Sequence, residues 1–195
     1  MSLKGNETDP RVIRTHQLIQ DAFTSLIKEK DFEDITVKEI AENATVNRAT
    51  FYAHFVDKYE ILDSKISESF TKILMKKITG HEAFNEETIR SIFLAVCDFH
   101  SELSTLCKRS YRSLGTLFEQ KVKDITQITL FKIMLKDMIF DSKEQLSIKT
   151  VSVMLSWGMY GAAYSWNNEG HQISAESFVE LNMPFLINGI KELLH

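Results

Sequence analysis

The polar residues best suited to binding chemistry lie in one short segment, residues 44–58, which reads ATVNRATFYAHFVDK. The segment offers a guanidinium, hydroxyls, an imidazole and an ammonium, which are groups that donate hydrogen bonds to phosphates and base edges. Phe51 and Phe55 are four residues apart and share one face of a helix, whereas Ala49 and Ala53 lie nearly opposite. The spacing predicts a short helix with an aromatic inner face, polar flanks and small residues at the centre of its outer face.

Catalytic and metal-binding chemistry find little support in the rest of the chain. The sequence contains no HExxH, GxSxG or phosphate-loop motif. Cys97 and Cys107 form neither a CxxC motif nor a Cys/His cluster, which favours two buried thiols over a disulfide or a zinc site. No metal-ligand spacing is found among the histidines, at positions 16, 54, 81, 100, 171 and 195. We therefore expect no enzyme, no metal site and no cofactor.

Composition indicates long, uninterrupted helices. The chain has 195 residues, of which 44% are hydrophobic and 26% charged, with only 2 prolines and 7 glycines. The net charge is −4, and residues 1–60 carry 8 basic against 11 acidic side chains, so nucleic-acid binding must rest on where the charges lie. No signal peptide is apparent, and the uncharged run at 150–168 is short for a membrane span. These features predict an all-α cytoplasmic protein without a membrane partner.

Helix signals divide the chain into a compact first part and a larger second part. Asp9 before Pro10 starts a helix to about residue 28, and a capping box at Thr36–Glu39 starts a short second helix. Asn47 can cap a third helix to about residue 55, and DKYE, residues 57–60, starts a long fourth. Longer helices follow at about 87–108, 113–139, 144–168 and 174–194, the last of them with Pro184 inside. We expect a DNA-binding part at 1–57, a connecting helix at about 58–79 and a larger helical part at 80–195.

Two short helices joined by a tight turn, the second with polar residues at its start, are typical of a helix-turn-helix. The stretch from residue 35 to 62, ITVKEIAENATVNRATFYAHFVDKYEIL, resembles the DNA-binding segment of the TetR family of bacterial transcriptional regulators. Its TVKEIA, VNRATFYAHF and DKYEIL motifs have the family's mutual spacing. One position departs: Thr45 stands in the turn where family members commonly have glycine, so it must accept a left-handed backbone at some cost.

The resemblance implies roles for individual residues. Tyr52, His54 and Lys58 match positions that usually meet the DNA backbone, and Thr36 implies a phosphate contact through its hydroxyl and amide. Simpler interpretations remain open: Tyr52 covering the core edge, His54 as an ordinary surface histidine, and Lys58 merely solvated. Thr36 is in any case a helix cap.

Base reading is expected from the start of the same helix. The resemblance places Arg48 and Thr50 where base-edge contacts are often made, with Asn47 beside them, and Arg48 could bind a guanine with two hydrogen bonds. Ala49 and Ala53 would let the helix approach the groove floor, where a methyl group can touch a thymine methyl. Alternatively, the two alanines are only good helix formers.

The resemblance also implies that the larger part dimerises and holds a small-molecule effector. Gly158 and Gly161 lie on a face of small residues, and the last helix is rich in apolar residues, so a two-fold homodimer through the last two helices is expected. Alternatively, these residues simply pack within one monomer. Candidate pocket residues are aromatic or basic and can equally be core. They are Phe99, His100, Tyr111, Trp157, Tyr160 and Tyr164.

Taken together, these features predict a dimeric transcriptional repressor that a small-molecule effector releases from a palindromic double-stranded operator. An activator, or a DNA-bound protein that recruits partners without a ligand, would share the same N-terminal residues. A helical adaptor that uses the first part for protein contacts is a further alternative.

Overall fold

The structure is a computed structural model that describes residues 9–80, 83–136 and 141–188. Within these ranges the chain forms α-helices and one short 3-10 helix, and no strand, which confirms the expected all-α class. The elements are α1 (Pro10–Glu29), η1 (Phe32–Asp34), α2 (Val37–Asn43), α3 (Arg48–His54), α4 (Lys58–Ile78), α5 (Glu86–Leu106), α6 (Gly115–Leu135), α7 (Ser142–Asn168) and α8 (Ala175–Asn188).

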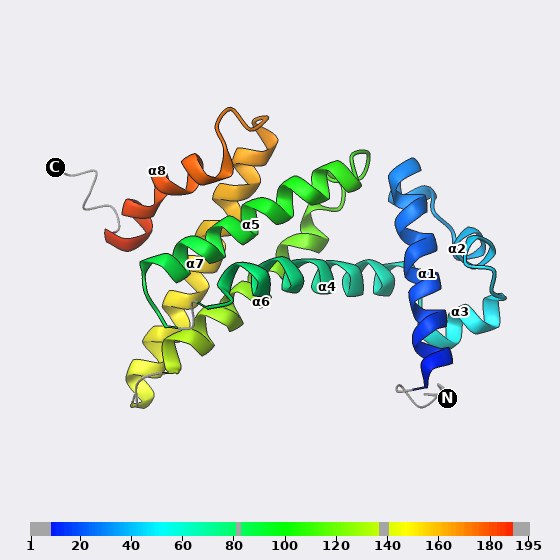
Figure 1. The fold of residues 1–195 in the computed structure, drawn as a ribbon, viewed down its shortest axis with the longest axis horizontal. Helices are drawn as coiled ribbons and strands as arrows, with labels where there is room; N and C mark the ends of the chain where they lie inside the picture. Colours follow the sequence, from blue (N-terminus) through cyan, green and yellow to red (C-terminus); the bar gives the residue numbers. More distant parts are fainter. Residues whose placement is uncertain (1–8, 81–82, 137–140, 189–195) are drawn as a thin grey trace.

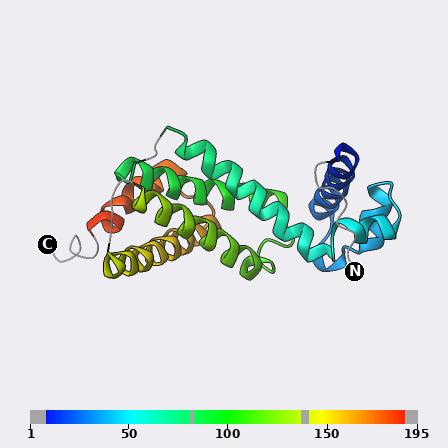
Figure 2. The same cartoon turned by 90° about the horizontal axis from the view of Figure 1, so that it is seen from below.

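Figure 1 shows α1, α2 and α3 grouped at one end of the molecule and α5 to α8 at the other, with α4 running between them. The view at 90° in Figure 2 shows the same separation. We call α1 to α3, with η1, the three-helix unit, and α5 to α8 the helical body. Because α4 enters both parts, it can carry a displacement of one part to the other.

The three-helix unit is built around aromatic side chains. Phe23, Phe32, Phe51 and Phe55 are all at most 3% exposed, and Phe23 meets Phe32 edge to face at 6.1 Å between ring centroids. Phe51 and Phe55 also contact each other, which confirms their expected role as the anchors of α3. Burying a side chain of this size contributes about 1.5–3 kcal/mol, so two anchors on a seven-residue helix hold it firmly.

Side-chain caps fix where α1, α3 and α4 begin. Asp9 accepts a hydrogen bond from the amide of Arg11, and Asp57 accepts one from the amide of Glu60. At α3, the Asn47 side chain accepts a hydrogen bond of 2.7 Å from the amide of Thr50. These contacts satisfy amide groups that have no partner within the helix, and they explain why sequence signals located the starts correctly.

The turn between α2 and α3 carries the strain expected of a missing glycine. Thr45 has a φ of 56°, in the left-handed region that β-branched residues disfavour. Its amide and that of Val46 donate to the carbonyls of Glu42 and Ala41, so hydrogen bonds hold the turn closed despite the strain.

Replacing Thr45 with glycine should raise the free energy of unfolding by about 1 kcal/mol, because glycine adopts this backbone without a Cβ clash. Urea denaturation of the two chains measures the difference. Thr45→Ala is the matched control, since it shortens the exposed side chain but keeps the Cβ. A gain with alanine as large as with glycine would contradict the attribution to backbone strain.

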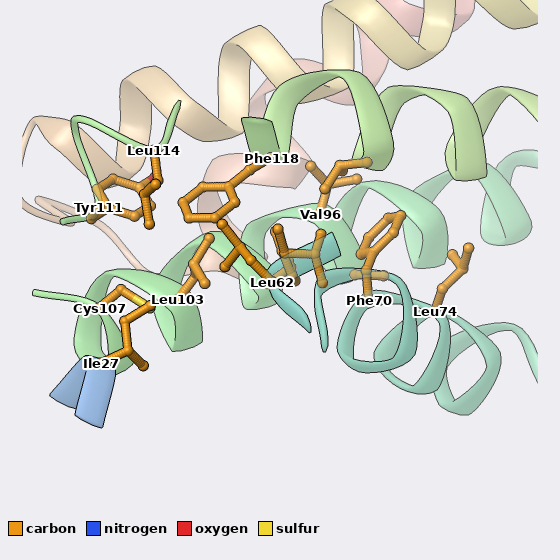
Figure 3. Packing of buried hydrophobic residues seen from close by; sticks show 14 of the residues in the cluster. Ile27, Leu62, Phe70, Leu74, Val96, Leu103, Cys107, Tyr111, Leu114 and Phe118 are labelled. Carbon is orange, nitrogen blue, oxygen red and sulfur yellow. The ribbon is translucent and has the colours of Figure 1, made fainter. Parts of the chain in front are cut away.

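The helical body packs α5 between several partners. α4 and α6 share a core with α5, in which Phe70 of α4 meets Phe99 of α5 at 5.3 Å between ring centroids. Figure 3 shows Phe70 and Leu74 on one side of this core and Phe118 of α6 on another. α8 packs mainly on α5, where Phe178 contacts Phe93 at 5.8 Å.

None of the described helices is long and apolar enough to span a bilayer.

The four long helices of the body lie close to the expected ranges. Gly170 has a φ of 86° just after α7, as a glycine that stops a helix should, and Pro184 lies inside α8. The expected ends of α6 at residue 139 and of α8 at 194 fall outside the described residues.

The two parts meet where α1 and η1 approach the connection between α5 and α6. Figure 3 shows Ile27 of α1 beside Cys107 and Leu103, with Leu62 of α4 close to Phe118. The Ser110 hydroxyl accepts a hydrogen bond of 2.7 Å from the amide of Phe32 and donates one of 3.3 Å to the Asp31 carboxylate. The contact between the two parts therefore combines apolar packing with hydrogen bonds of defined geometry.

Candidate nucleic-acid interface

The outer face of α3 is open along its length. Arg48, Ala49 and Ala53 are exposed, and Tyr52 is 57% exposed with its ring edge-on to Phe51. Thr50 is half-buried at the flank. A helix with methyl groups at its centre and longer polar side chains around them can approach the floor of a DNA major groove, which is about 12 Å wide.

Arg48 is free to act at this face. It is exposed at the first position of α3, and it has no ion-pair partner among the described residues. Asn47, in contrast, is committed through its side-chain oxygen to the cap of the helix. Of the residues expected to read bases, Arg48 thus has the longest side chain and the fewest contacts within the protein.

Thr36 is occupied by its capping box. Its hydroxyl accepts from the Glu39 amide and donates to the Glu39 carboxylate, and its own amide donates to the same carboxylate. Lys30 also binds that carboxylate, and this hydrogen bond, with those from Thr36, lowers the pKa of Glu39 to about 2. Both groups through which Thr36 was expected to meet a phosphate are therefore already used, and its cap role is the one with structural support.

His54 forms a contact that sequence reasoning did not anticipate. Its ring lies 5.9 Å from that of His16 in α1, and His16 in turn stacks on Phe55 at 4.4 Å. Burial, and secondly the charge of His16, lower the pKa of His54, so the imidazole favours its neutral form. His54 remains half-buried at the edge of the α3 face, where it can offer one hydrogen bond. No spacing signal in the sequence links residues 16 and 54.

The structure places Lys58 inward. Its ammonium donates to the carbonyls of Phe32 and Glu33 at 2.8 and 2.9 Å and lies 4.6 Å from the centre of the Phe32 ring. The side chain is only 14% exposed. Lys58 thus links the start of α4 to η1. This internal role differs from the expected contact with a DNA phosphate.

Lys58→Met should lower the free energy of unfolding by about 2 kcal/mol, because two carbonyls lose a charged donor. The salt dependence of DNA binding should stay the same, whereas loss of a phosphate contact would flatten it by about one unit. Lys38→Met is the matched control, since Lys38 is an exposed cation of α2 with only a 3.8 Å pair to Glu42. Denaturation and salt titrations of both variants separate the two roles for Lys58.

The expected effector residues are brought together in the helical body, except for one. His100 is fully buried, its Nδ1 lies 2.8 Å from the Tyr111 hydroxyl, and its ring contacts those of Tyr160, Tyr164 and Phe99. Burial lowers the pKa of His100 to about 4, so it is neutral at physiological pH. Within the described part of the chain, its Nε2 is buried without a hydrogen-bond partner.

Trp157 lies apart from this cluster. It is 58% exposed, and the ammonium of Lys123 in α6 lies 3.6 Å from the centre of its ring. Helical spacing puts Trp157 on the same side of α7 as Tyr160 and Tyr164, so periodicity alone does not separate it from them. The structure does separate it, because its exposed ring contacts Lys123 and not His100.

Comparison with known proteins agrees with this geometry. Residues 19–64, which hold α2, α3 and most of α1, match the family model of bacterial regulatory proteins, tetR family. This part of the chain is therefore a TetR-type helix-turn-helix. YxbF, an HTH-type transcriptional regulator of Bacillus subtilis (strain 168), is 33% identical over 104 residues, which are 53% of this chain and 27% of that protein. The chain spans 27% and 56% of the length of the two curated relatives it matches, and both bear names of regulators, not of enzymes.

Solved structures of transcriptional regulators share the fold of nearly the whole chain. The fatty acid degradation regulator FadR from Bacillus halodurans has a TM-score of 0.58 at 18% identity and covers 95% of this chain and 99% of its own. FadR from Bacillus subtilis, solved in complex with stearoyl-CoA, has a TM-score of 0.57 at 17% identity, with coverage of 89% and 98%. At these identities the likeness establishes the fold alone.

Proposed function

We propose that this chain is a TetR-family, sequence-specific DNA-binding regulator of transcription that acts in the cytoplasm as a homodimer. The open face of α3 carries the proposal, because Arg48 is exposed there without an ion-pair partner among the described residues, while Phe51 and Phe55 anchor the helix in the core. Residues 1–57 would bind DNA, 58–79 would connect, and 80–195 would dimerise and bind an effector. Arg48 and Thr50 would read bases while Tyr52 and His54 touch the backbone.

The proposed dimer uses the exposed apolar faces of α7 and α8. Met154 is 68% exposed and Leu181 is 64% exposed, which is unusual for such side chains on ordered helices. Gly158 and Gly161 of α7 are open outward, with nothing within 4 Å of where a Cβ would stand. A second copy could approach closely at these glycines and cover the apolar side chains around them.

We infer that a small-molecule effector governs DNA binding. The support is the buried His100 cluster, which combines aromatic walls with one imidazole nitrogen that lacks a partner. The FadR structure with stearoyl-CoA illustrates a similar fold holding a small molecule. The effector would favour a dimer in which the two α3 helices no longer match half-sites one DNA turn apart.

A gel shift with DNA from upstream of the chain's own gene tests the proposal. We expect a salt-sensitive, saturable complex with one dimer on a near-palindromic site. If the folded, dimeric protein binds no duplex even at low salt, the regulator proposal fails. Transcription measured with and without the protein then separates a repressor from an activator on the same site.

A further inference from the structure

A basic surface pocket lies at the connection between α5 and α6, beside the end of α7. Its volume is about 320 Å³, and it is lined by Lys108, Arg109 and Arg112 together with polar residues that include Tyr111 and Asn167. We call it the basic pocket. Its lining contains no acidic residue.

The three cations of the basic pocket lack the carboxylate partners that some other cations of the molecule have. Lys30, Lys77 and Lys121, for example, each bind a carboxylate. Lys108, Arg109 and Arg112 have no ion-pair partner anywhere in the described ranges, and all three are exposed. Three like charges around one hollow repel one another, and an anion bound between them would relieve this repulsion.

The inner wall of the pocket is polar and ordered. Tyr111 is 5% exposed and its hydroxyl contacts Nδ1 of His100, whose Nε2 is the buried nitrogen without a partner. The Asn167 side-chain oxygen lies 2.6 Å from Nε2 of His171. The pocket therefore combines cations at its mouth with hydrogen-bonding groups inside, and Tyr111 links it to the aromatic cluster.

The segment that contributes Arg109 and Tyr111 to the basic pocket also contacts the three-helix unit. Ser110 stands between Arg109 and Tyr111 in the chain, and its hydroxyl binds the Phe32 amide and the Asp31 carboxylate. The carbonyls of Phe32 and Glu33 in turn accept hydrogen bonds from the Lys58 ammonium at the start of α4, three residues after Phe55, the C-terminal cap of α3. A ligand that moves Arg109 or Tyr111 must move Ser110 or strain these hydrogen bonds.

We propose that the basic pocket binds a phosphate-bearing small molecule and that its occupancy is transmitted to the three-helix unit through Ser110. Three unpaired cations match two or more negative charges, and arginine binds phosphate with paired hydrogen bonds. The first part of the proposal, phosphate binding (the binding half), does not depend on the proposed function. The second part, transmission through Ser110 (the transmission half), rests on it. The alternative role of the cations is to stabilise the carboxyl end of α5.

Calorimetry with the full chain and inorganic pyrophosphate tests the binding half without DNA. We expect saturable binding with a dissociation constant of about 1 mM or tighter, and at least tenfold weaker binding by the double variant Arg109→Gln/Arg112→Gln. Lys72→Gln/Lys76→Gln removes the same charge from the exposed side of α4 and should bind like the unaltered chain. Equal loss in both double variants, or no saturable binding, overturns the proposal. Citrate, at equal ionic strength, should bind more weakly, and stronger citrate binding would contradict the phosphate assignment.

A DNA titration with and without pyrophosphate tests the transmission half. We expect pyrophosphate to lower the affinity of the unaltered chain for its operator at least fivefold, and an unchanged or higher affinity contradicts transmission. Ser110→Ala should keep pyrophosphate binding within about twofold and lose the effect on DNA. If the unaltered chain binds no DNA at all, the proposed function and transmission both fail, while calorimetry still decides the pocket. The result for the unaltered chain stands even if Ser110→Ala does not fold.

Discussion

A chain carrying Gly161→Glu should be monomeric and should bind a two-half-site operator about 100-fold more weakly than the unaltered chain. Gly161 is exposed on α7 with open space where a Cβ would stand, so the monomer accommodates the new side chain. Glutamate also favours the helix by up to about 1 kcal/mol over glycine. Loss of the dimer would therefore reflect a buried charge in the interface and not damage to the fold.

Sedimentation of Gly161→Glu at several concentrations gives its oligomeric state, and DNA titration gives the accompanying loss of affinity. Thr71→Glu is the matched control, because it adds the same charge at an exposed position of α4. We expect Thr71→Glu to remain a dimer with nearly normal affinity. A dimeric Gly161→Glu would place the interface elsewhere than on this face of α7.

Arg48→Ala should lose about 1–3 kcal/mol of binding free energy in each half-site, or about 2–6 kcal/mol for a dimer on both. The loss should arise at one base pair in each half-site. At that position, the preference of the protein for one base pair over the others should weaken. The fold should be unaffected, because Arg48 is exposed and pairs with no carboxylate in the described ranges.

Selection of binding sites from randomised duplexes measures both the affinity and the preference of Arg48→Ala. Lys38→Ala is the comparison, since it removes an exposed cation from α2 and should weaken all sequences alike. If Arg48→Ala also weakens all sequences equally, Arg48 contacts a phosphate, and its assignment to base reading is wrong.

Local signals in the sequence were sufficient for the elements of the three-helix unit. Caps such as Asp9, Asn47 and Asp57 act within three residues of themselves, so residue type and spacing identify them. The left-handed turn at Thr45 is equally local, because the motif around it fixes the geometry of the turn. Helical periodicity likewise separated buried Phe51 and Phe55 from exposed Ala49 and Ala53.

Contacts between distant segments could not be predicted in this way. Lys58 looked like a surface cation, but it binds carbonyls 25 and 26 residues earlier in the chain. Ser110 has no motif of its own, and it acts on Phe32 from 78 residues away. The packing of α8 on α5 is a similar case, because it joins segments about 80 residues apart. Such contacts depend on how helices are placed in space, which periodicity does not specify.

Directed cleavage of DNA from the outer face of α3 tests the central claim most directly. Ala53→Cys provides an exposed thiol for an iron chelate, while Cys97 and Cys107 are buried, which raises the pKa of their thiols to about 12 and about 11 and makes them unreactive. We expect two clusters of cleavage in the major groove, one per half-site and about one helical turn, or 34–36 Å, apart. Cleavage that is absent or spread evenly along the bound DNA would show that α3 does not enter the groove.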